Sequence, residues 1–161
     1  MTEKQFNDAV SENSARLYSL ALSYTRCKDD AEDILQNTFI KLWKRTEPFT
    51  DSTHLNKWLT RVCVNECKSF LLSPFRKKTV SPDACKEAYT LDSDADYDVL
   101  SAVMRLKKKE RVVIHLYYYE GYKISEIAEL LKTNDSTVKT RLRRAREHLK
   151  TILGEDYYDK I

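Results

Sequence analysis

Residues 139–150 carry a dense cluster of cationic side chains: six Lys and Arg residues stand against one carboxylate, Glu147. An arginine guanidinium can donate two parallel hydrogen bonds to a guanine edge or to a phosphate. Runs of charge are usually solvated helix faces, but such faces normally mix the two signs. We therefore predict that this segment contacts DNA.

Two apolar stripes predict the helices that position these side chains. One stripe runs through the basic segment at three- and four-residue steps, and a shorter one lies within residues 127–131. The turn between them contains no glycine, so we expect Asn134 to take the left-handed backbone conformation and Asn134 or Asp135 to cap the second helix. This arrangement is the outline of a helix-turn-helix DNA reader.

The second helix of this pair has one face opposite its apolar stripe. At 100 degrees per residue, that face would enter the major groove, and hydroxyl groups at the helix start would lie near the DNA backbone. We expect these residues to contact DNA: Ser136, Thr137, Lys139, Thr140, Arg143 and Arg144.

Composition favours an all-α protein. Only two Gly and three Pro occur among 161 residues, which leaves little material for hairpin turns. No apolar run approaches the roughly 20 residues of a membrane span, and the N-terminal sequence MTEKQFNDAV lacks a signal-like core. We expect a cytoplasmic location.

The pattern predicts two small helical domains. Residues 1–73 should form three helices: one from a capping box of Thr2 and Gln5 to about residue 27, one from Asp29 to about residue 45, and one ending before Pro74. Residues 74–96 should be a flexible linker. Residues 97–153 should form four short helices, with breaks after residues 106 and 119, and residues 154–161 a short tail.

The cysteines allow two interpretations. Cys63 and Cys67 stand four apart within an apolar helical segment, which favours small core thiols. A zinc- or thiol-switched sensor would use the same pair with Cys85 and His54. Zinc sites more often use CxxC pairs, so we expect neither a metal nor a cofactor, and disulfides are not expected in the cytoplasm.

Three segments, in order, resemble the extracytoplasmic-function (ECF) sigma factors of bacterial RNA polymerase: DDAEDILQNTFIKLWKR, HLNKWLTRVCVNECKSFL and LKKKERVVIHLYYYEGYKISEIAELLKTNDSTVKTRLRRAREHL. The resemblance covers nearly the whole chain and implies a region 2 domain, a linker and a region 4 domain. It implies a non-enzymatic initiation factor that binds core RNA polymerase and promoter DNA with minus 10 and minus 35 elements.

In the first segment, Ile40 and Trp43 fall outside the predicted buried arc of Ala31, Ile34, Leu35, Thr38 and Leu42. An apolar patch ringed by acids and amides is typical of a protein interface, and in the family this helix docks on the clamp coiled coil of the polymerase. The alternative is that Trp43 closes the N-terminal core. The resemblance assigns polymerase binding to Asp33, Gln36, Asn37, Ile40 and Trp43.

In the family, the second segment reads the minus 10 element as single-stranded DNA and takes a flipped base into a pocket. An aromatic or apolar wall can stack on such a base, an Asn amide can bond its edge, and cations can hold the phosphates. Without the resemblance, Phe49 and Val62 would be interpreted as core. The matching residues are Arg45, Phe49, Val62 and Asn65, with Lys57, Arg61 and Lys68 on the strand.

The resemblance also implies further partners. Family region 4 contacts the polymerase flap as well as the minus 35 duplex, and regulation commonly comes from an anti-sigma factor, often membrane-bound. Residues 81–98 carry a net charge of minus five, so the linker could imitate nucleic acid in a basic channel. We expect a monomer when the chain is free. The rival class is a dimeric helix-turn-helix repressor or activator that uses Ile40 and Trp43 as a self-interface.

Overall fold

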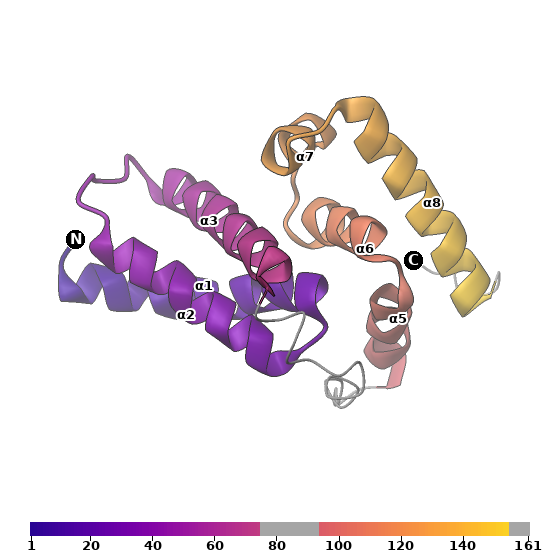
Figure 1. The fold of residues 1–161 in the computed structure, drawn as a ribbon, viewed down its shortest axis with the longest axis horizontal. Coiled ribbons are helices and arrows are strands. Elements are labelled where there is room, and N and C mark those ends of the chain that lie inside the picture. Colours follow the sequence, from indigo (N-terminus) through magenta and orange to yellow (C-terminus); the bar gives the residue numbers. More distant parts are fainter. Residues whose placement is uncertain (75–93, 155–161) are drawn as a thin grey trace. The chain divides into compact units, whose positions relative to one another are not determined.

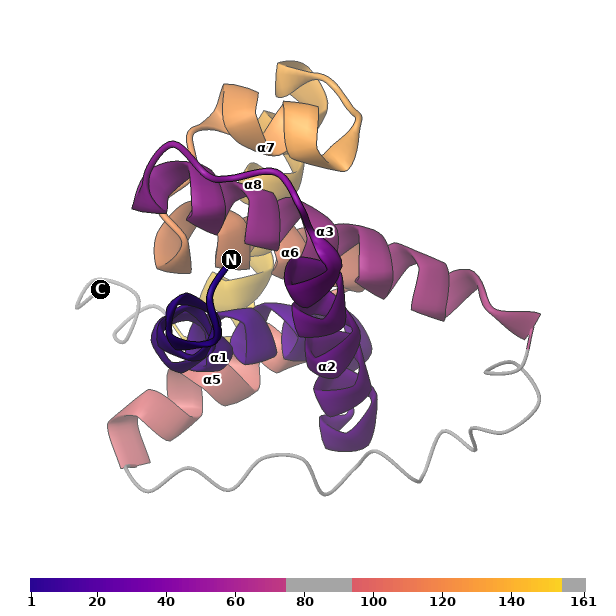
Figure 2. The same ribbon diagram turned by 90° about the vertical axis from the view of Figure 1, so that its left-hand side faces the viewer.

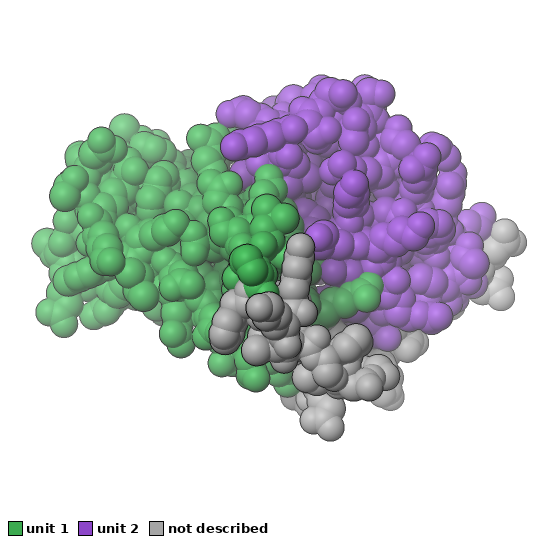
Figure 3. Space-filling view, in the orientation of Figure 1, with its two compact units in different colours: residues 1–86 green, residues 87–161 purple. Residues whose placement is uncertain are grey.

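The structure, a computed structural model, describes residues 1–74 and 94–154, with the side chains of residues 94–98 left aside (Figure 1). It divides into two compact units, Met1–Lys86 and Glu87–Ile161, coloured separately in Figure 3. Throughout these ranges the regular secondary structure is helical and includes no strand. The predicted all-α class is confirmed.

Three helices form the described part of the first unit: α1 (Glu3–Thr25), α2 (Lys28–Lys44) and α3 (Ser52–Leu72). Each packs against the other two, and Figure 2 views α1 almost end-on. Burial of large aliphatic side chains from all three helices supplies most of the stabilisation. The most deeply buried are Leu17, Leu20, Ile34, Leu42, Leu59 and Val64.

The ends of these helices agree with local capping chemistry in two of three cases. The capping box of Thr2 and Gln5 is present, and Asp51 caps α3 by accepting from the His54 amide at 2.7 Å. The predicted start of α2 at Asp29 is wrong: Cys27 is the N-cap, without a side-chain hydrogen bond. Asp29 instead lies in the first turn, where the helix dipole favours a carboxylate.

The two core cysteines lie where the sequence predicts. Cys63 and Cys67 are fully buried on α3, and the Cys63 thiol donates to the Leu17 carbonyl at 3.7 Å. A hydrogen bond with the Cys63 side chain, together with burial, raises the pKa of the Cys67 thiol. Cys85 lies outside the described residues, and the described part of the chain contains no group of three or more His, Cys, Asp or Glu side chains arranged to hold a metal.

The second unit contains α5 (Asp94–Arg105), α6 (Lys108–Ile114), a π-helical turn at His115–Tyr119, α7 (Ile124–Leu131) and α8 (Asp135–Leu153). Its core is built from Leu106, Val113, Leu116, Ile127, Val138 and Leu142. Helix α5 begins three residues before the predicted residue 97. Residues 75–93 of the predicted linker and 155–161 of the predicted tail lie outside the described residues.

Two local features of this unit differ from the prediction. The helix predicted over residues 108–119 changes to π geometry after Ile114, with the Glu120 amide donating to the His115 carbonyl at 3.1 Å. Within this turn Leu116 is buried, Tyr117 is half-buried, and Tyr118 and Tyr119 are exposed. Gly121 then breaks the helix with φ of +70°.

The tight turn before α8 also corrects one prediction. Lys132, not Asn134, takes the left-handed conformation, with φ of 54°. Asn134 is extended, and its side chain accepts from the Thr137 amide at 2.8 Å, so Asn134 is the N-cap. The cap and the left-handed residue are thus two residues apart, and together they turn α8 against α7.

Candidate nucleic-acid and protein interfaces

The exposed face of α8 contains all six side chains predicted to contact DNA. Ser136, Lys139, Arg143 and Arg144 are exposed, and Thr137 and Thr140 are half-buried. The opposite face, with Val138 and Leu142, is buried against the rest of the unit. Arg143 donates to Glu147 at 2.8 Å, an exposed pair one helical turn apart. The other cations of this face are therefore available to a nucleic acid without displacing Glu147.

A groove of about 920 Å³ lies between the start of α6 and α8. Three consecutive lysines, Lys107, Lys108 and Lys109, form one wall, and Thr140, Arg141 and Arg144 stand on the other. Sequence reasoning missed these lysines as site residues, although the run LKKKER was a usable signal. Cations on both walls of one groove suit a polyanion, since each can neutralise a different phosphate.

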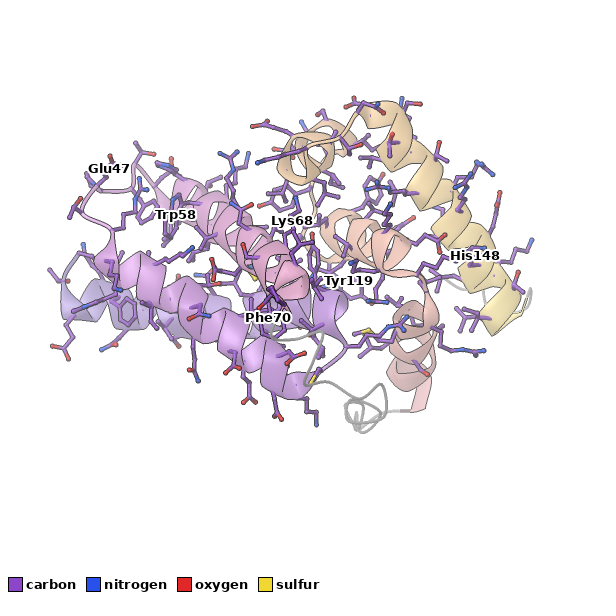
Figure 4. The ribbon with its side chains drawn as sticks, viewed as in Figure 1. Glu47, Trp58, Lys68, Phe70, Tyr119 and His148 are labelled. Atoms are coloured by element: carbon purple, nitrogen blue, oxygen red, sulfur yellow. The ribbon has the colours of Figure 1, made fainter. Side chains whose placement is uncertain are left out.

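One contact joins two residues that line this groove from opposite helices. His148 Nδ1 on α8 lies 2.8 Å from Glu110 Oε2 on α6, and the Glu110 side chain is only 8% exposed. Figure 4 labels His148 on α8. Because a buried carboxylate is stable only when it is paired, this contact holds the start of α6, with its lysines, in position beside α8.

The first unit holds a stacked cluster where the loop after α2 meets the start of α3. The Arg45 guanidinium carbon lies 4.8 Å from the ring centroid of Phe49 and 5.0 Å from that of Trp58. The Phe49 and Trp58 centroids are 5.5 Å apart, in an edge-to-face arrangement. Phe49 is half-buried, so part of this residue remains accessible at this end of α3.

The remaining residues predicted for single-stranded DNA follow α3 away from this cluster. Lys57, Arg61 and Asn65 are exposed at four-residue steps, while Val62 and Lys68 are half-buried. Asn65 stands two turns beyond Trp58, roughly 10 Å of helix rise away. The structure therefore brings Arg45 and Phe49 together and places Val62 and Asn65 further along the same helix.

Helix α2 exposes the apolar residues that the sequence placed outside its buried arc. Ile40 is 48% and Trp43 53% exposed, and Asp33, Gln36 and Asn37 are exposed on the same helix. The Trp43 ring also packs edge-to-face on Phe6 at 5.0 Å. Trp43 thus packs against Phe6 at one edge of the core, while about half of the Trp43 surface remains exposed to solvent. Leu35 is half-buried, and Phe39 joins the buried arc in its place.

No described helix combines the length and apolar character that crossing a bilayer requires. The fold and these exposed surfaces define a two-domain helical protein whose second unit carries a helix-turn-helix with a basic groove beside it.

Comparison with known families matches both units. Residues 9–74 match the family described as sigma-70 region 2, and residues 97–149 match the family described as sigma-70, region 4. SigM, an ECF RNA polymerase sigma factor of Mycobacterium tuberculosis, is 28% identical over 92% of this chain and 77% of its own length. SigV, an RNA polymerase sigma factor of Bacillus subtilis, is 29% identical over 91% of this chain and 90% of its own.

Two solved structures share the fold. The sigma factor RpoE from Bartonella quintana, solved with the anti-sigma factor NepR, superposes with a TM-score of 0.71 at 24% identity, covering 93% of this chain and 97% of that one. CnrH, solved with the cytosolic domain of CnrY, superposes with a TM-score of 0.61 at 22% identity. The match covers 94% of this chain and 89% of the CnrH chain.

Because regions 2 and 4 follow in this order, and the relatives cover nine-tenths of the chain, the chain belongs to the ECF group of the sigma-70 family. It is a non-enzymatic RNA polymerase sigma factor that acts in the initiation of DNA-templated transcription.

Proposed function

We propose that the chain divides promoter recognition among three surfaces: the exposed face of α2 for core RNA polymerase, α3 with its preceding loop for the minus 10 element, and α8 for the minus 35 element. The observation that carries the minus 35 assignment is the groove between Lys107–Lys109 and α8, which has cations on both walls. The functional domains are residues 1–73 and 97–153, joined by a linker over 74–96.

The polymerase surface consists of Asp33, Gln36, Asn37, Ile40 and Trp43 on α2. Its support is the exposure of Ile40 and Trp43 on a helix whose neighbouring exposed groups are acids and amides. Exposed large apolar side chains with a polar rim are typical of protein interfaces. The partner is the clamp coiled coil of the polymerase, and the second unit adds a contact with the flap.

The minus 10 element is bound as single-stranded DNA by Arg45, Phe49, Lys57, Arg61, Val62, Asn65 and Lys68. Support comes from the aromatic surface of Phe49 at the start of α3 and from the exposed cations that follow it along one helix. Stacking on an aromatic ring combined with phosphate contacts is the usual chemistry of single-strand binding. Asn65 then reads a base edge.

The minus 35 element is bound as duplex by Ser136, Thr137, Lys139, Thr140, Arg143 and Arg144. Their support is exposure on one face of a helix capped by Asn134, next to the basic groove. Arg144 lines that groove, and Arg143 forms an ion pair with Glu147. We assign base reading to the arginines and backbone contacts to the hydroxyls at the helix start.

We further propose that a separate anti-sigma factor regulates the chain in the cytoplasm by covering the polymerase-binding surfaces. The support is that the RpoE structure was solved with the anti-sigma factor NepR and the CnrH structure with the cytosolic domain of CnrY. An anti-sigma factor anchored in the membrane is the form we expect, and the free chain is expected to be a monomer.

The test is run-off transcription from a promoter library by sigma-free core polymerase, with and without this chain. We expect discrete new start sites, each preceded by two spaced sequence motifs. Absence of new starts, together with operator binding by a dimer of the chain alone, would establish the repressor class instead. Size-exclusion chromatography with light scattering distinguishes the monomer from that dimer.

A further inference from the structure

The Arg45 guanidinium is held in place from two sides. Its carbon lies within 5.0 Å of the ring centroids of both Phe49 and Trp58, and its side chain is only 19% exposed. A guanidinium over two aromatic faces is attracted by their ring quadrupoles. Figure 4 labels Glu47 on the loop before α3 and Trp58 on α3 itself. Arg45 is therefore a fixed cation.

The loop around the stack is anchored as well. The Arg45 Nε donates to the backbone carbonyl of Glu47 at 3.1 Å. Further along, the Thr50 amide donates to His54 Nδ1 at 3.4 Å, and the Phe49 ring meets the His54 ring edge-to-face at 5.3 Å. The loop backbone is thus tied to Arg45 at one end and to the first turn of α3 at the other.

The Glu47 carboxylate is the weakly held member of this group. Arg45 Nη2 donates to Glu47 Oε2 at 3.0 Å, but the Glu47 side chain is 77% exposed. An exposed ion pair of this kind contributes little net stability because water screens it. The fixed guanidinium thus faces a carboxylate that can leave at small cost. A phosphate offers the guanidinium the same planar pair of oxygen acceptors.

We propose that Glu47 is a built-in competitor of the DNA strand: its carboxylate occupies Arg45 in the free protein, and a phosphate of the single-stranded minus 10 DNA replaces it on binding. This inference rests on the proposed minus 10 function of Arg45. In this role Glu47 weakens the binding of any DNA strand, because Arg45 must first release the carboxylate. Other contacts, made by α3, have to supply the binding free energy that is lost. Glu47 therefore lowers the affinity for every strand alike, so that a stable complex depends on the additional sequence-reading contacts of α3.

The competitor role of Glu47 predicts how the affinity for the strand and its salt dependence change when the carboxylate is removed. A phosphate that displaces the Glu47 carboxylate takes over its contact with Arg45, whereas a neutral side chain at position 47 leaves the Arg45 guanidinium without that anionic partner before the strand binds. Removing the carboxylate should therefore tighten binding and steepen its salt dependence by up to about 0.7 in the logarithmic slope, the value for one single-strand phosphate. Tightening should be about twofold to fivefold, the range of an exposed ion pair.

The experiment measures holoenzyme, made with the full chain, binding to a fluorescein-labelled single-stranded oligonucleotide that carries the minus 10 element recovered from the promoter library. Fluorescence anisotropy over a KCl series gives affinity and salt slope for the unmodified chain, Glu47→Gln, Arg45→Gln and the double variant. The matched control is Glu12→Gln, because Glu12 shares an acidic surface pocket with Glu47 and makes no described contact with Arg45. Circular dichroism checks the fold of each variant.

We expect Glu47→Gln to bind more tightly with a steeper slope, Glu12→Gln to behave as the unmodified chain, and Glu47→Gln to have no effect once Arg45 is Gln. An unchanged affinity in Glu47→Gln, or a gain that persists without Arg45, would overturn the competitor role while leaving the proposed function intact. If holoenzyme with the unmodified chain binds the strand no better than core polymerase alone, the proposed minus 10 function fails, and the competitor role with it.

Discussion

His148 Nδ1 and Glu110 Oε2 lie 2.8 Å apart, although 38 residues separate them in the chain. The pair joins helix α8 to the start of α6, beside the three lysines that form the other wall of the basic groove. The carboxylate is buried and the imidazole is half exposed, so the histidine is the partner that keeps the carboxylate satisfied.

His148→Ala should destabilise the second unit because it leaves the buried Glu110 carboxylate without this partner. We expect a loss of about 1–3 kcal/mol in the free energy of unfolding. Urea unfolding followed by circular dichroism measures it. The effect should shrink markedly in a Glu110→Gln background, where no buried charge remains; an equal loss in both backgrounds would refute the anchoring role.

Arg144→Ala should relax sequence preference at the minus 35 element, with a cost of roughly 1–3 kcal/mol for the preferred sequence, because a bidentate base contact is lost. Lys108→Ala, on the opposite wall of the groove, is the matched control. It should weaken all sequences alike and lower the salt slope by about 0.9, the value for one duplex phosphate. Competition binding of holoenzyme with single-position promoter variants separates the two outcomes.

Asn65→Ala should blur one position of the minus 10 element, because an exposed amide at this point of α3 can both donate to and accept from a base edge. Transcription from a library randomised over that element, followed by sequencing of the transcripts, identifies the position. Ser69→Ala, one turn further along the same helix and also exposed, should leave the sequence preference unchanged. If Asn65→Ala gives the same sequence preference as Ser69→Ala, Asn65 does not read a base of the minus 10 element.

Ile40→Glu should weaken core polymerase binding at least tenfold without unfolding the chain, because Ile40 is exposed and a charge there would be buried at the interface without a partner. Competition against a labelled sigma factor for core polymerase measures the loss. Lys44→Ala, at the end of the same helix, is the control that should bind normally. Normal core binding by Ile40→Glu would exclude this face of α2.

The buried thiols should react only through unfolding. In a Cys27→Ser, Cys85→Ser background, Cys63 and Cys67 are the remaining cysteines, and labelling by Ellman's reagent should follow the unfolding rate. The hydrogen bond with Cys63 and burial raise the pKa of Cys67, so the folded state holds this proton more tightly than the unfolded chain does. Stability should therefore fall as pH rises above about 8.5, the value of a free thiol. Rapid labelling of the folded protein would contradict this prediction.

The sequence by itself determined the helices and the face that each one buries. Apolar residues at three- and four-residue steps are buried together on a helix, so the buried face of α8 follows from spacing alone. Most of the buried face of α2 does too, except that Phe39 is buried there in place of Leu35. Capping chemistry is equally local: Thr2 with Gln5 and Asn134 with Thr137 bond over three residues, so their partners stand within one turn. For the same reason, the exposed cations of α8 could be predicted as a set.

Only the tertiary structure decided which distant side chains meet. Arg45 stacks on Trp58, and Glu110 pairs with His148, because helix packing brings separate segments together, and no local periodicity encodes those distances. The same holds for the left-handed Lys132, whose backbone is set by how α7 and α8 must join rather than by its own weak preference. The groove beside Lys107–Lys109 also depends on the tertiary structure. Its lysines can be read from the sequence, but α8 forms the opposite wall only because the core of the unit packs the two helices side by side.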